Sequence, residues 1–397
     1  MKWLWIILFF IIIWCMLDLN FGRLRQKKQV KKREYPFRTG EMNLFTTGPK
    51  LFSQYFTEIE KAQSSVNIIF YIVKNDQISK KFFSLLEKKA KDGIKVRLLI
   101  DWLGSHRVGR KNIKKARAAG VEIALANRPR LPFLFFSLQK RNHRKISVID
   151  GKIGYLGGYN IGKEYIHLDP ILTPWRDYHL RVTGEGVSDL QNEFFLDWVH
   201  AGKKDVQKDM FDFPTLPIGS IKHTFIPSEG AFLEEQLIQL FTQAKESIYI
   251  GTPYFIPTKK LQCSLLSALK RNISIKILVP KKSDHILVKE ASYRYLRALM
   301  AEGAEVYEYI NGFFHAKIII IDEEICDIGT ANFDRRSMLL NHEINCIIYQ
   351  KEYTKQIVSA FSYDLEHSQR LNEQALQNLH WVTKSKELIT RLIENFL

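Results

Sequence analysis

The chain has 397 residues, enough for two domains of ordinary size that each bury a core of their own. Its 59 lysines and arginines outnumber 42 aspartates and glutamates, and the formal charge of +17 predicts an anionic partner such as a phospholipid surface or nucleic acid. The four cysteines show no C-x-x-C spacing, which argues against a zinc site and a disulfide scaffold; we expect reduced thiols.

The first segment of the chain is uncharged and strongly apolar. It reads WLWIILFFIIIWCML and covers residues 3–17. As a helix it would be about 22 Å long, shorter than a ~30 Å hydrocarbon core, so crossing a bilayer would require local thinning. A cleaved signal peptide is the alternative, but no Ala-x-Ala-like cleavage site follows. We therefore predict a single-pass membrane anchor over residues 1–20.

A basic segment follows, and we predict a juxtamembrane linker over residues 21–36. Its positive charges come from Arg23, Arg25, Lys27, Lys28, Lys31, Lys32 and Arg33. By the positive-inside rule, this bias places the anchor in the cell membrane with the body of the protein on the cytoplasmic side. The same charges are expected to attract anionic headgroups, unless the segment is a solvated linker that only sets topology.

The remainder alternates β-rich runs with amphipathic helical stretches, a pattern typical of α/β layers. In the first half, strands are predicted at residues 66–73 and 94–101 around a helix at 79–93. The second half repeats this order with a strand at 247–255, a helix at 261–272 and a strand at 273–280. Proline and glycine in FDFPTLPIGS, residues 211–220, mark a junction. We predict two similar lobes, 37–213 and 214–397.

An aromatic and basic segment, NRPRLPFLFFSLQK, covers residues 127–140. Two interpretations remain open. The apolar residues could dip into the headgroup region and admit lipid, or they could form a core strand with basic flanks.

A polar motif occurs twice at the same spacing. HRKISVID at residues 143–150 is matched by HAKIIIID at 315–322, and Gly157 and Asn160 are matched by Gly329 and Asn332, always 172 residues later. Each motif is expected on a strand, so the histidine and lysine share a face, His143 with Lys145 and His315 with Lys317. Asp150 and Asp322 fall at the strand ends and suit a turn better than the chemistry.

Two histidines and two lysines facing each other suit the cleavage of a phosphodiester. One imidazole can attack phosphorus while the other protonates the leaving alcohol, and the ammonium groups can neutralise the phosphoryl oxygens. Nothing in the sequence indicates a metal cluster. A reactive imidazole also needs an acceptor on its far nitrogen, and we predict that Asp177 supports His143 and Glu343 supports His315. The alternative is that these acids form ordinary ion pairs with Arg176 or Arg336.

The duplicated H-x-K-x4-D motif, followed by a glycine-rich turn and asparagine, resembles the phospholipase D superfamily. The flanking GGYNIGKEY, PWRDYH, TPYFIP and NFDRRSMLLNHEIN resemble its bacterial cardiolipin synthase branch. This resemblance implies an α/β fold with two α/β/α lobes related by a pseudo-two-fold axis and sharing one active site. One departure from the family pattern is that this sequence shows a single apparent membrane span, whereas relatives in this branch often have two.

The resemblance also implies a reaction without a cofactor or metal. A phosphatidyl group would pass from one phosphatidylglycerol to a histidine, with release of glycerol, and then to a second phosphatidylglycerol to give cardiolipin. The family pattern makes His143 the nucleophile and His315 the general acid and base, and counts Asp150 and Asp322 in the catalytic motifs. It assigns phosphate binding to Lys145, Lys317, Asn160 and Asn332, with Thr330 supplying a hydroxyl that the first motif's GGYN lacks.

Several functions remain as alternatives. A different phosphatidyltransferase or a lipid hydrolase would share both lobes and differ in the acceptor. A nuclease of the same superfamily would suit the positive charge. A membrane scaffold without activity would have no physical reason to keep both His-Lys pairs. We expect phosphatidylglycerol and the bilayer as partners, and no nucleic acid.

Overall fold

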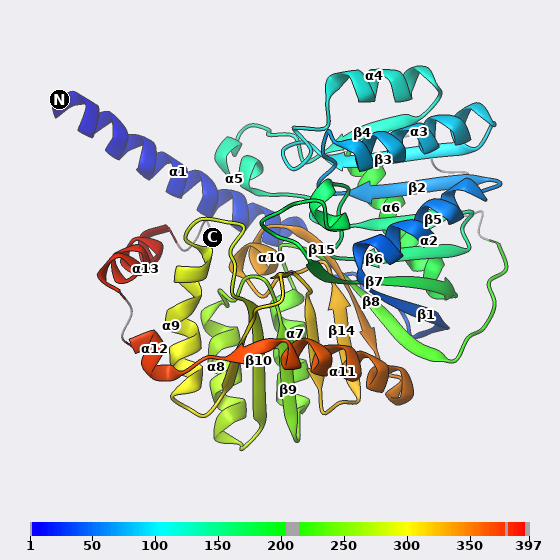
Figure 1. Ribbon diagram of the computed structural model, residues 1–397. Helices are drawn as coiled ribbons and strands as arrows, with labels where there is room; N and C mark the ends of the chain where they lie inside the picture. Colours follow the sequence, from blue (N-terminus) through cyan, green and yellow to red (C-terminus); the bar gives the residue numbers. More distant parts are fainter. Residues whose placement is uncertain (1, 204–213, 378–379, 394–397) are drawn as a thin grey trace.

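The computed structural model describes residues 2–203, 214–377 and 380–393 and shows an α/β protein built on one continuous sheet (Figure 1). The strands of the first half are β1 (Arg38–Thr47), β2 (Ser65–Phe70), β3 (Lys95–Asp101), β4 (Glu122–Ala126), β5 (Ile146–Ile149), β6 (Ile153–Gly157) and β7 (Trp175–Gly184). Those of the second half are β8 (Ile221–Glu229), β9 (Ser247–Gly251), β10 (Ser274–Pro280), β11 (Glu305–Tyr309), β12 (Phe313–Phe314), β13 (Ile318–Ile321), β14 (Ile325–Gly329), β15 (His342–Ile348) and β16 (Ser368–Arg370).

The strand order repeats between the two halves. The sheet runs β16-β11-β10-β9-β13-β14-β15-β8-β1-β7-β6-β5-β2-β3-β4, so each lobe contributes the same succession outward from the middle. The lobes meet where β1 and β8 pair antiparallel, with Arg38 opposite His223. The duplication seen in the sequence is therefore a duplication of topology. The predicted junction at 213/214 falls at the edge of residues 204–213, which lie outside the described residues.

Helices repeat in the same way. The first lobe has α2 (Gly48–Glu60), α3 (Gln77–Lys91), α4 (Arg110–Ala118), α5 (Leu134–Gln139), η1 (Lys163–Ile166) and α6 (Gly186–His200). The second has α7 (Leu233–Gln243), α8 (Lys259–Lys270), α9 (Val288–Met300), α10 (Arg335–Leu339), α11 (Lys351–Glu366), α12 (Glu373–Gln377) and α13 (Trp381–Ile393). Capping sets the starts of α3 and α8, because Asp76 accepts from the Ser79 amide at 3.0 Å and Thr258 from the Leu261 amide at 3.3 Å.

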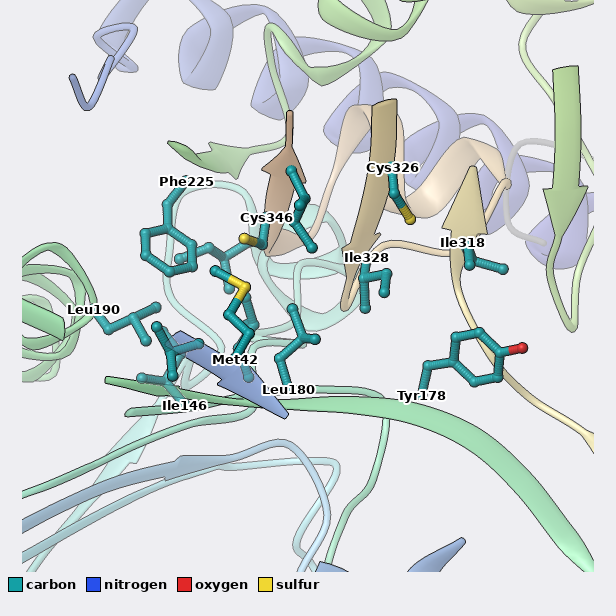
Figure 2. Close-up of a cluster of buried hydrophobic side chains, with 14 of the residues drawn as sticks. Met42, Ile146, Tyr178, Leu180, Leu190, Phe225, Ile318, Cys326, Ile328 and Cys346 are labelled. Carbon is teal, nitrogen blue, oxygen red and sulfur yellow. The ribbon is translucent and has the colours of Figure 1, made fainter. Parts of the chain in front are cut away.

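The central hydrophobic core joins the two lobes (Figure 2). Met42 and Leu180 of the first lobe belong to the same cluster as Phe225, Ile328 and Cys346 of the second. Each fully buried aliphatic or aromatic side chain of this kind contributes about 1.5–3 kcal/mol. Two further clusters lie one in each lobe. Because the central core is shared, the lobes are held in one arrangement around the region between them.

The N-terminal helix α1 (Lys2–Gln29) is longer than the predicted anchor and projects from the body (Figure 1). Its apolar side chains are exposed over residues 3–14, whereas Asp18, Leu19, Gly22 and Gln26 are buried against the protein. It is long and apolar enough to cross a membrane. Most of the predicted linker over 21–36 is thus helical, and its final arginine, Arg33, forms ion pairs with the body.

The aromatic segment before the first motif is not the core strand that one interpretation proposed. It forms the short helix α5, which packs on α1 (Figure 1). Asp18 accepts a hydrogen bond from the Phe136 amide at 2.7 Å, and Phe136 packs with Leu19 and Leu340. Leu131 is 81% exposed beside it. A short apolar run reads as strand or helix equally well in sequence, and here the contact with α1 decides the outcome.

Candidate active site

The two motif histidines lie at equivalent points of the repeated topology. His143 and Lys145 are in extended backbone directly before β5, and His315 and Lys317 are directly before β13. The regular ladder thus begins one residue after each lysine, slightly later than predicted. The histidines are only 8% and 6% exposed, and the lysines are buried. The four groups therefore sit in a largely desolvated environment.

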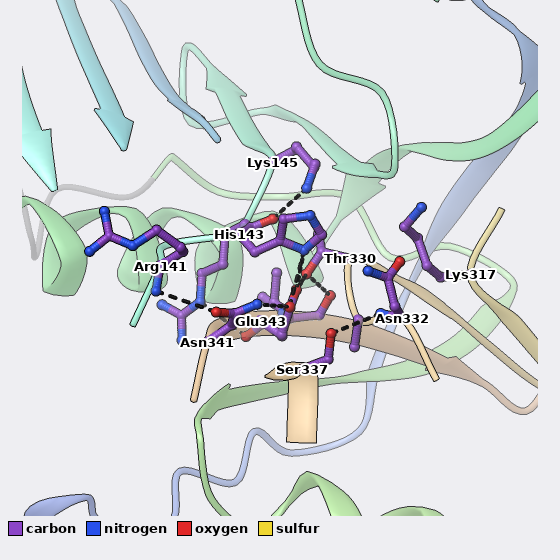
Figure 3. A network of polar contacts seen from close by, with 12 residues as sticks. Arg141, His143, Lys145, Lys317, Thr330, Asn332, Ser337, Asn341 and Glu343 are labelled. Carbon is purple, nitrogen blue, oxygen red and sulfur yellow. Dashed lines mark hydrogen bonds and ion pairs between the residues drawn. The ribbon is translucent and has the colours of Figure 1, made fainter. Parts of the chain in front are cut away.

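Each histidine is hydrogen-bonded to a carboxylate of the opposite lobe. Glu343 on β15 accepts from Nδ1 of His143 at 2.9 and 3.0 Å (Figure 3), and Asp177 on β7 accepts from Nδ1 of His315 at 2.6 Å. The predicted pairing, Asp177 with His143 and Glu343 with His315, is wrong. The alternative that one of these acids pairs with Arg176 is also wrong, since Arg176 binds Asp364 instead.

Backbone pairing between the lobes explains this exchange. Strand β12 runs parallel to β7, and the His315 amide donates to the Arg176 carbonyl oxygen at 2.7 Å. The same arrangement recurs at the first motif, where the His143 amide donates to the His342 carbonyl oxygen at 2.9 Å. Each histidine is thereby placed beside the acid-bearing strand of the other lobe. The sequence prediction assumed that each acid serves its own lobe.

Burial and neighbouring charges set the protonation of the site. Burial lowers the pKa of Lys145 to about 7, that of Lys317 to about 8 and that of His315 to about 4. Burial also lowers the pKa of His143, and Lys317 of the other motif contributes. Although burial opposes their ionisation, the facing cations hold the pKa of Asp177 and Glu343 below the usual range. The two motifs thus share one electrostatic environment, with ionised carboxylates and Nε2 of each imidazole turned away from them.

The asparagines of the two motifs differ in their surroundings. Asn332 lies beside Lys317, and its side-chain oxygen is buried without a hydrogen-bond partner within the described chain (Figure 3). Asn160 is engaged at both ends, because its oxygen accepts from the Ile72 amide at 3.0 Å and its nitrogen donates to the Tyr165 hydroxyl at 3.2 Å. Asn332 is therefore the better placed of the two to meet a ligand.

The residue next to the histidine-binding carboxylate differs between the two lobes. Thr330 donates to Glu343 at 2.7 Å and accepts from the Ile344 amide at 2.9 Å, so its hydroxyl fixes the carboxylate rather than pointing into open space. The equivalent residue of the first lobe is Gly158. A Cβ there would lie 2.0 Å from Oδ1 of Asp177. The GGYN sequence lacks a hydroxyl because the carboxylate occupies that space.

The motif aspartates are separated from this chemistry. Asp150 accepts from the backbone amides of residues 63–65 at 2.7 to 3.1 Å, and Asp322 accepts from those of residues 245–247 at 2.8 to 3.2 Å. Each follows its histidine by seven residues of extended chain, or about 23 Å. The assignment of Asp150 and Asp322 to the catalytic residues is therefore corrected. Both hold the loops that lead into β2 and β9, as their place at the strand ends indicated.

Other site residues were not predicted. Tyr71 packs edge-on against the His143 ring at 4.9 Å, and Tyr254 packs against His315 at 6.2 Å. Arg144 is fully buried, pairs with Glu193 and Asp197, and donates to the Glu343 carbonyl oxygen at 3.0 Å. The tyrosines follow equivalent strands, β2 and β9, so the internal repeat contained a signal for them. Across the residues that the structure describes, no group of three potential ligands is placed to hold a metal ion.

Comparison with known proteins places this geometry among related sequences. A family model described as "Cardiolipin synthase, PLD-like domain" matches residues 55–170 and 237–365. The minor cardiolipin synthase ClsB of Bacillus subtilis is 38% identical over 392 residues, covering 99% of this chain and 98% of the relative. The major cardiolipin synthase ClsA of the same organism is 38% identical over 363 residues, with 90% and 75% covered.

The fold also matches a solved structure. A phosphatidylserine synthase from Haemophilus influenzae Rd KW20 superimposes with a TM-score of 0.72, covering 95% of this chain and 99% of that one. At 14% sequence identity this likeness concerns the fold alone. Together with the PLD-like family model, which matches one region in each half, it confirms the predicted pair of phospholipase D-type lobes.

Proposed function

Because the chain belongs to the family of cardiolipin synthases with phospholipase D-like domains, we propose that it transfers a phosphatidyl group from one phosphatidylglycerol to another. Glycerol and cardiolipin are the products. The observation that carries the proposal is the pair of buried imidazoles, each with a carboxylate of the opposite lobe on Nδ1 and a lysine two residues on.

In the first step, His143 is the nucleophile. Glu343 accepts a hydrogen bond from the Nδ1–H of His143, which keeps the proton on Nδ1 and leaves the Nε2 lone pair free to attack phosphorus. A P–N bond forms while the P–O bond to glycerol breaks, and His315 donates a proton to the departing oxygen. The negative charge of the bound substrate raises the pKa of His315 from about 4, so that it can carry this proton.

In the second step, His315 acts as the base. It takes the proton of a hydroxyl group on the second phosphatidylglycerol, and that oxygen attacks phosphorus as the P–N bond breaks. His143 is regenerated and cardiolipin is released. Lys145, Lys317 and Asn332 are proposed to bind the phosphoryl oxygens, whose negative charge offsets the cost of burying two ammonium groups.

The membrane arrangement follows from α1. Its apolar residues 3–17 are proposed to lie in the bilayer, with the basic residues that follow on the cytoplasmic side. The two lobes then meet their substrate at the membrane surface.

The test is to supply purified full-length protein with phosphatidylglycerol vesicles and a chelator, and to identify products by mass spectrometry. Equal amounts of cardiolipin and glycerol are expected, and neither from His143→Ala or His315→Ala protein. Phosphatidic acid as the sole lipid product would make water the acceptor and the protein a hydrolase. Intact lipid together with cleavage of added nucleic acid would contradict the proposal altogether.

A further inference from the structure

A cavity lies between helix α1 and the loop around α5. Its volume is about 650 Å³, within the range of ligand pockets. One wall is formed by α1 and the residues that follow it, Gly22 to Arg33, and the other by residues 127–140. These walls contact each other closely where α5 packs on α1 (Figure 1).

The cavity is strongly cationic. Six positive side chains line it, and Glu229 is its one lining carboxylate within the described residues; the cations are Arg25, Lys31, Arg33, Arg128, Arg130 and Lys140. Arg33 is already paired with Glu229 at 2.7 Å and with Glu193 at 2.9 Å.

The other cations are left without acids. Arg25 lies 6.0 Å from the centre of the Phe133 ring. Lys31, Arg128, Arg130 and Lys140 form no ion pair with any described residue. Burial is the main cause that lowers the pKa of Lys140, and Arg144 and Arg130 lower it further, against the opposing effect of Glu229 and Asp197. Arg25, Lys31, Arg128 and Arg130 are solvent-exposed, so their charges alone cost little, but a cluster of unpaired cations attracts an anionic ligand.

One buried side chain of the lining also lacks a partner. His342 is 4% exposed, and its Nε2 makes no hydrogen bond to any described residue, while Nδ1 faces Asp197 at 3.4 Å. Because Asp197 faces Nδ1, Nε2 can donate to a ligand oxygen when the imidazole is protonated, and an anionic ligand favours that charged form.

This cavity is separate from the two-histidine site. His342 and Glu343 are neighbours on β15, so their side chains leave opposite faces of the strand. Glu343 faces His143, and His342 faces the cavity. A ligand held here would therefore lie behind the strand that carries the His143 acceptor.

We propose that the cavity binds the phosphate headgroup of a further anionic phospholipid, apart from the two that take part in the reaction. The position favours a lipid over a free anion. The wall formed by α1 continues directly into the exposed apolar residues 3–14, and Leu131, 81% exposed, lines the cavity and can meet acyl chains. The bound lipid ties α1 to the loop before the first motif. This site is independent of which acceptor the two-histidine site uses.

The experiment counts bound lipid instead of turnover, so its failure is distinct from failure of the proposed reaction. Full-length His143→Asn protein, which cannot consume lipid, is titrated with phosphatidylglycerol and examined by native mass spectrometry. The two-histidine site can hold a donor and an acceptor lipid, so the expected result is one bound lipid more than that site accounts for. Adding Arg128→Gln, Arg130→Gln and Lys140→Gln together should remove one bound lipid per chain, or weaken the corresponding binding event at least tenfold.

A matched control removes the same charge elsewhere. Arg110→Gln, Lys111→Gln and Lys114→Gln on α4 change three exposed cations that do not line the cavity, and this variant should bind as many lipids as the His143→Asn protein. Equal lipid binding by the two triple variants would overturn the proposal. So would displacement of the additional lipid by millimolar inorganic phosphate but not by chloride of equal ionic strength, since the ligand would then be a free anion.

A second measurement needs no cavity variant and so does not depend on how that variant folds. A photoreactive phosphatidylglycerol is added to the His143→Asn protein, and the adducts are mapped by peptide sequencing. Adducts on residues 22–33 and 127–140 are expected, and excess phosphatidylglycerol but not phosphatidylcholine should suppress them. Adducts confined to residues 3–17 and the two motifs would refute a second headgroup site.

Discussion

Because each motif histidine is hydrogen-bonded to a carboxylate of the other lobe, substituting a histidine and substituting its carboxylate should impair the same catalytic step. Glu343→Gln removes the charge that accepts from His143, and Asp177→Asn removes the one that accepts from His315. Both acids are fully buried. Each carboxylate orients its imidazole and stabilises the imidazolium form, so its removal is expected to lower the rate by roughly 10²–10⁴-fold.

A substrate with a better leaving group distinguishes the loss of rate in Glu343→Gln from that in Asp177→Asn. A phosphatidylglycerol analogue with p-nitrophenol in place of glycerol releases a stable anion that needs no proton. The burst of p-nitrophenolate reports the first step alone. Asp177→Asn and His315→Ala should then recover to within about tenfold of the unmodified protein, because general acid catalysis is no longer required. Glu343→Gln and His143→Ala should remain defective, because the nucleophile is still impaired.

The reverse grouping would refute this reasoning. If Asp177→Asn stayed as slow as His143→Ala while Glu343→Gln recovered, the hydrogen bonds between lobes would not define the working pairs. Recovery of His143→Ala with retention of the defect in His315→Ala would keep the pairs but exchange nucleophile and acid. Circular dichroism and thermal melting of all four variants serve as the control for folding.

Three further outcomes follow from single contacts. Thr330→Val, which removes the donor to Glu343, should lower kcat about 10-fold or more, whereas Thr330→Ser should remain near the unmodified rate. Lys145→Met should abolish turnover yet raise Tm. The folded pKa of about 7 lies below the usual 10.5, so the buried ammonium destabilises the fold most below pH 7 and the gain should vanish as the pH rises to 10.5. Asp150→Asn should cost about 1–3 kcal/mol in urea unfolding at pH 7 with little change in kcat. Since the pKa of Asp150 is depressed, this stability is present at neutral pH and should be lost as the pH falls below about 4.

The fold could be predicted from the sequence because the same pattern of elements and motifs occurs in both halves of the chain. Strand, helix and strand recur in the same order in both halves, and the polar motifs keep a constant offset of 172 residues. Such a repeat fixes which elements are equivalent. It does not determine how two equivalent units are joined, and the antiparallel pairing of β1 with β8 depends on long-range contacts that no local pattern encodes.

The same limit explains the incorrect carboxylate pairing. Asp177 and Glu343 occupy equivalent positions, so a prediction from equivalence could identify both acids but not the lobe that each one serves. The deciding contacts are two short stretches of parallel backbone, one at Phe314 and one at Asn142. The extent of α1 was missed for a related reason: its last turns are charged on one side and are held by contacts with α5, which lies more than a hundred residues away in the chain.

A perfectly symmetric site would give both histidines the same reactivity, whereas transfer through a covalent intermediate needs one nucleophile and one proton carrier. In this chain the residues that contact the two histidine-binding carboxylates differ between the lobes, so the site is not symmetric. On one side a glutamate is fixed by a threonine hydroxyl, and on the other a shorter aspartate fills the space that Gly158 leaves open. Glu343 is further held by Asn341 at 3.4 Å, and Arg144 binds its backbone. Asp177 instead accepts from the Tyr178 amide at 2.8 Å. The carboxylate held by two side-chain donors therefore belongs to His143, and a positioned imidazole is what in-line attack on phosphorus requires.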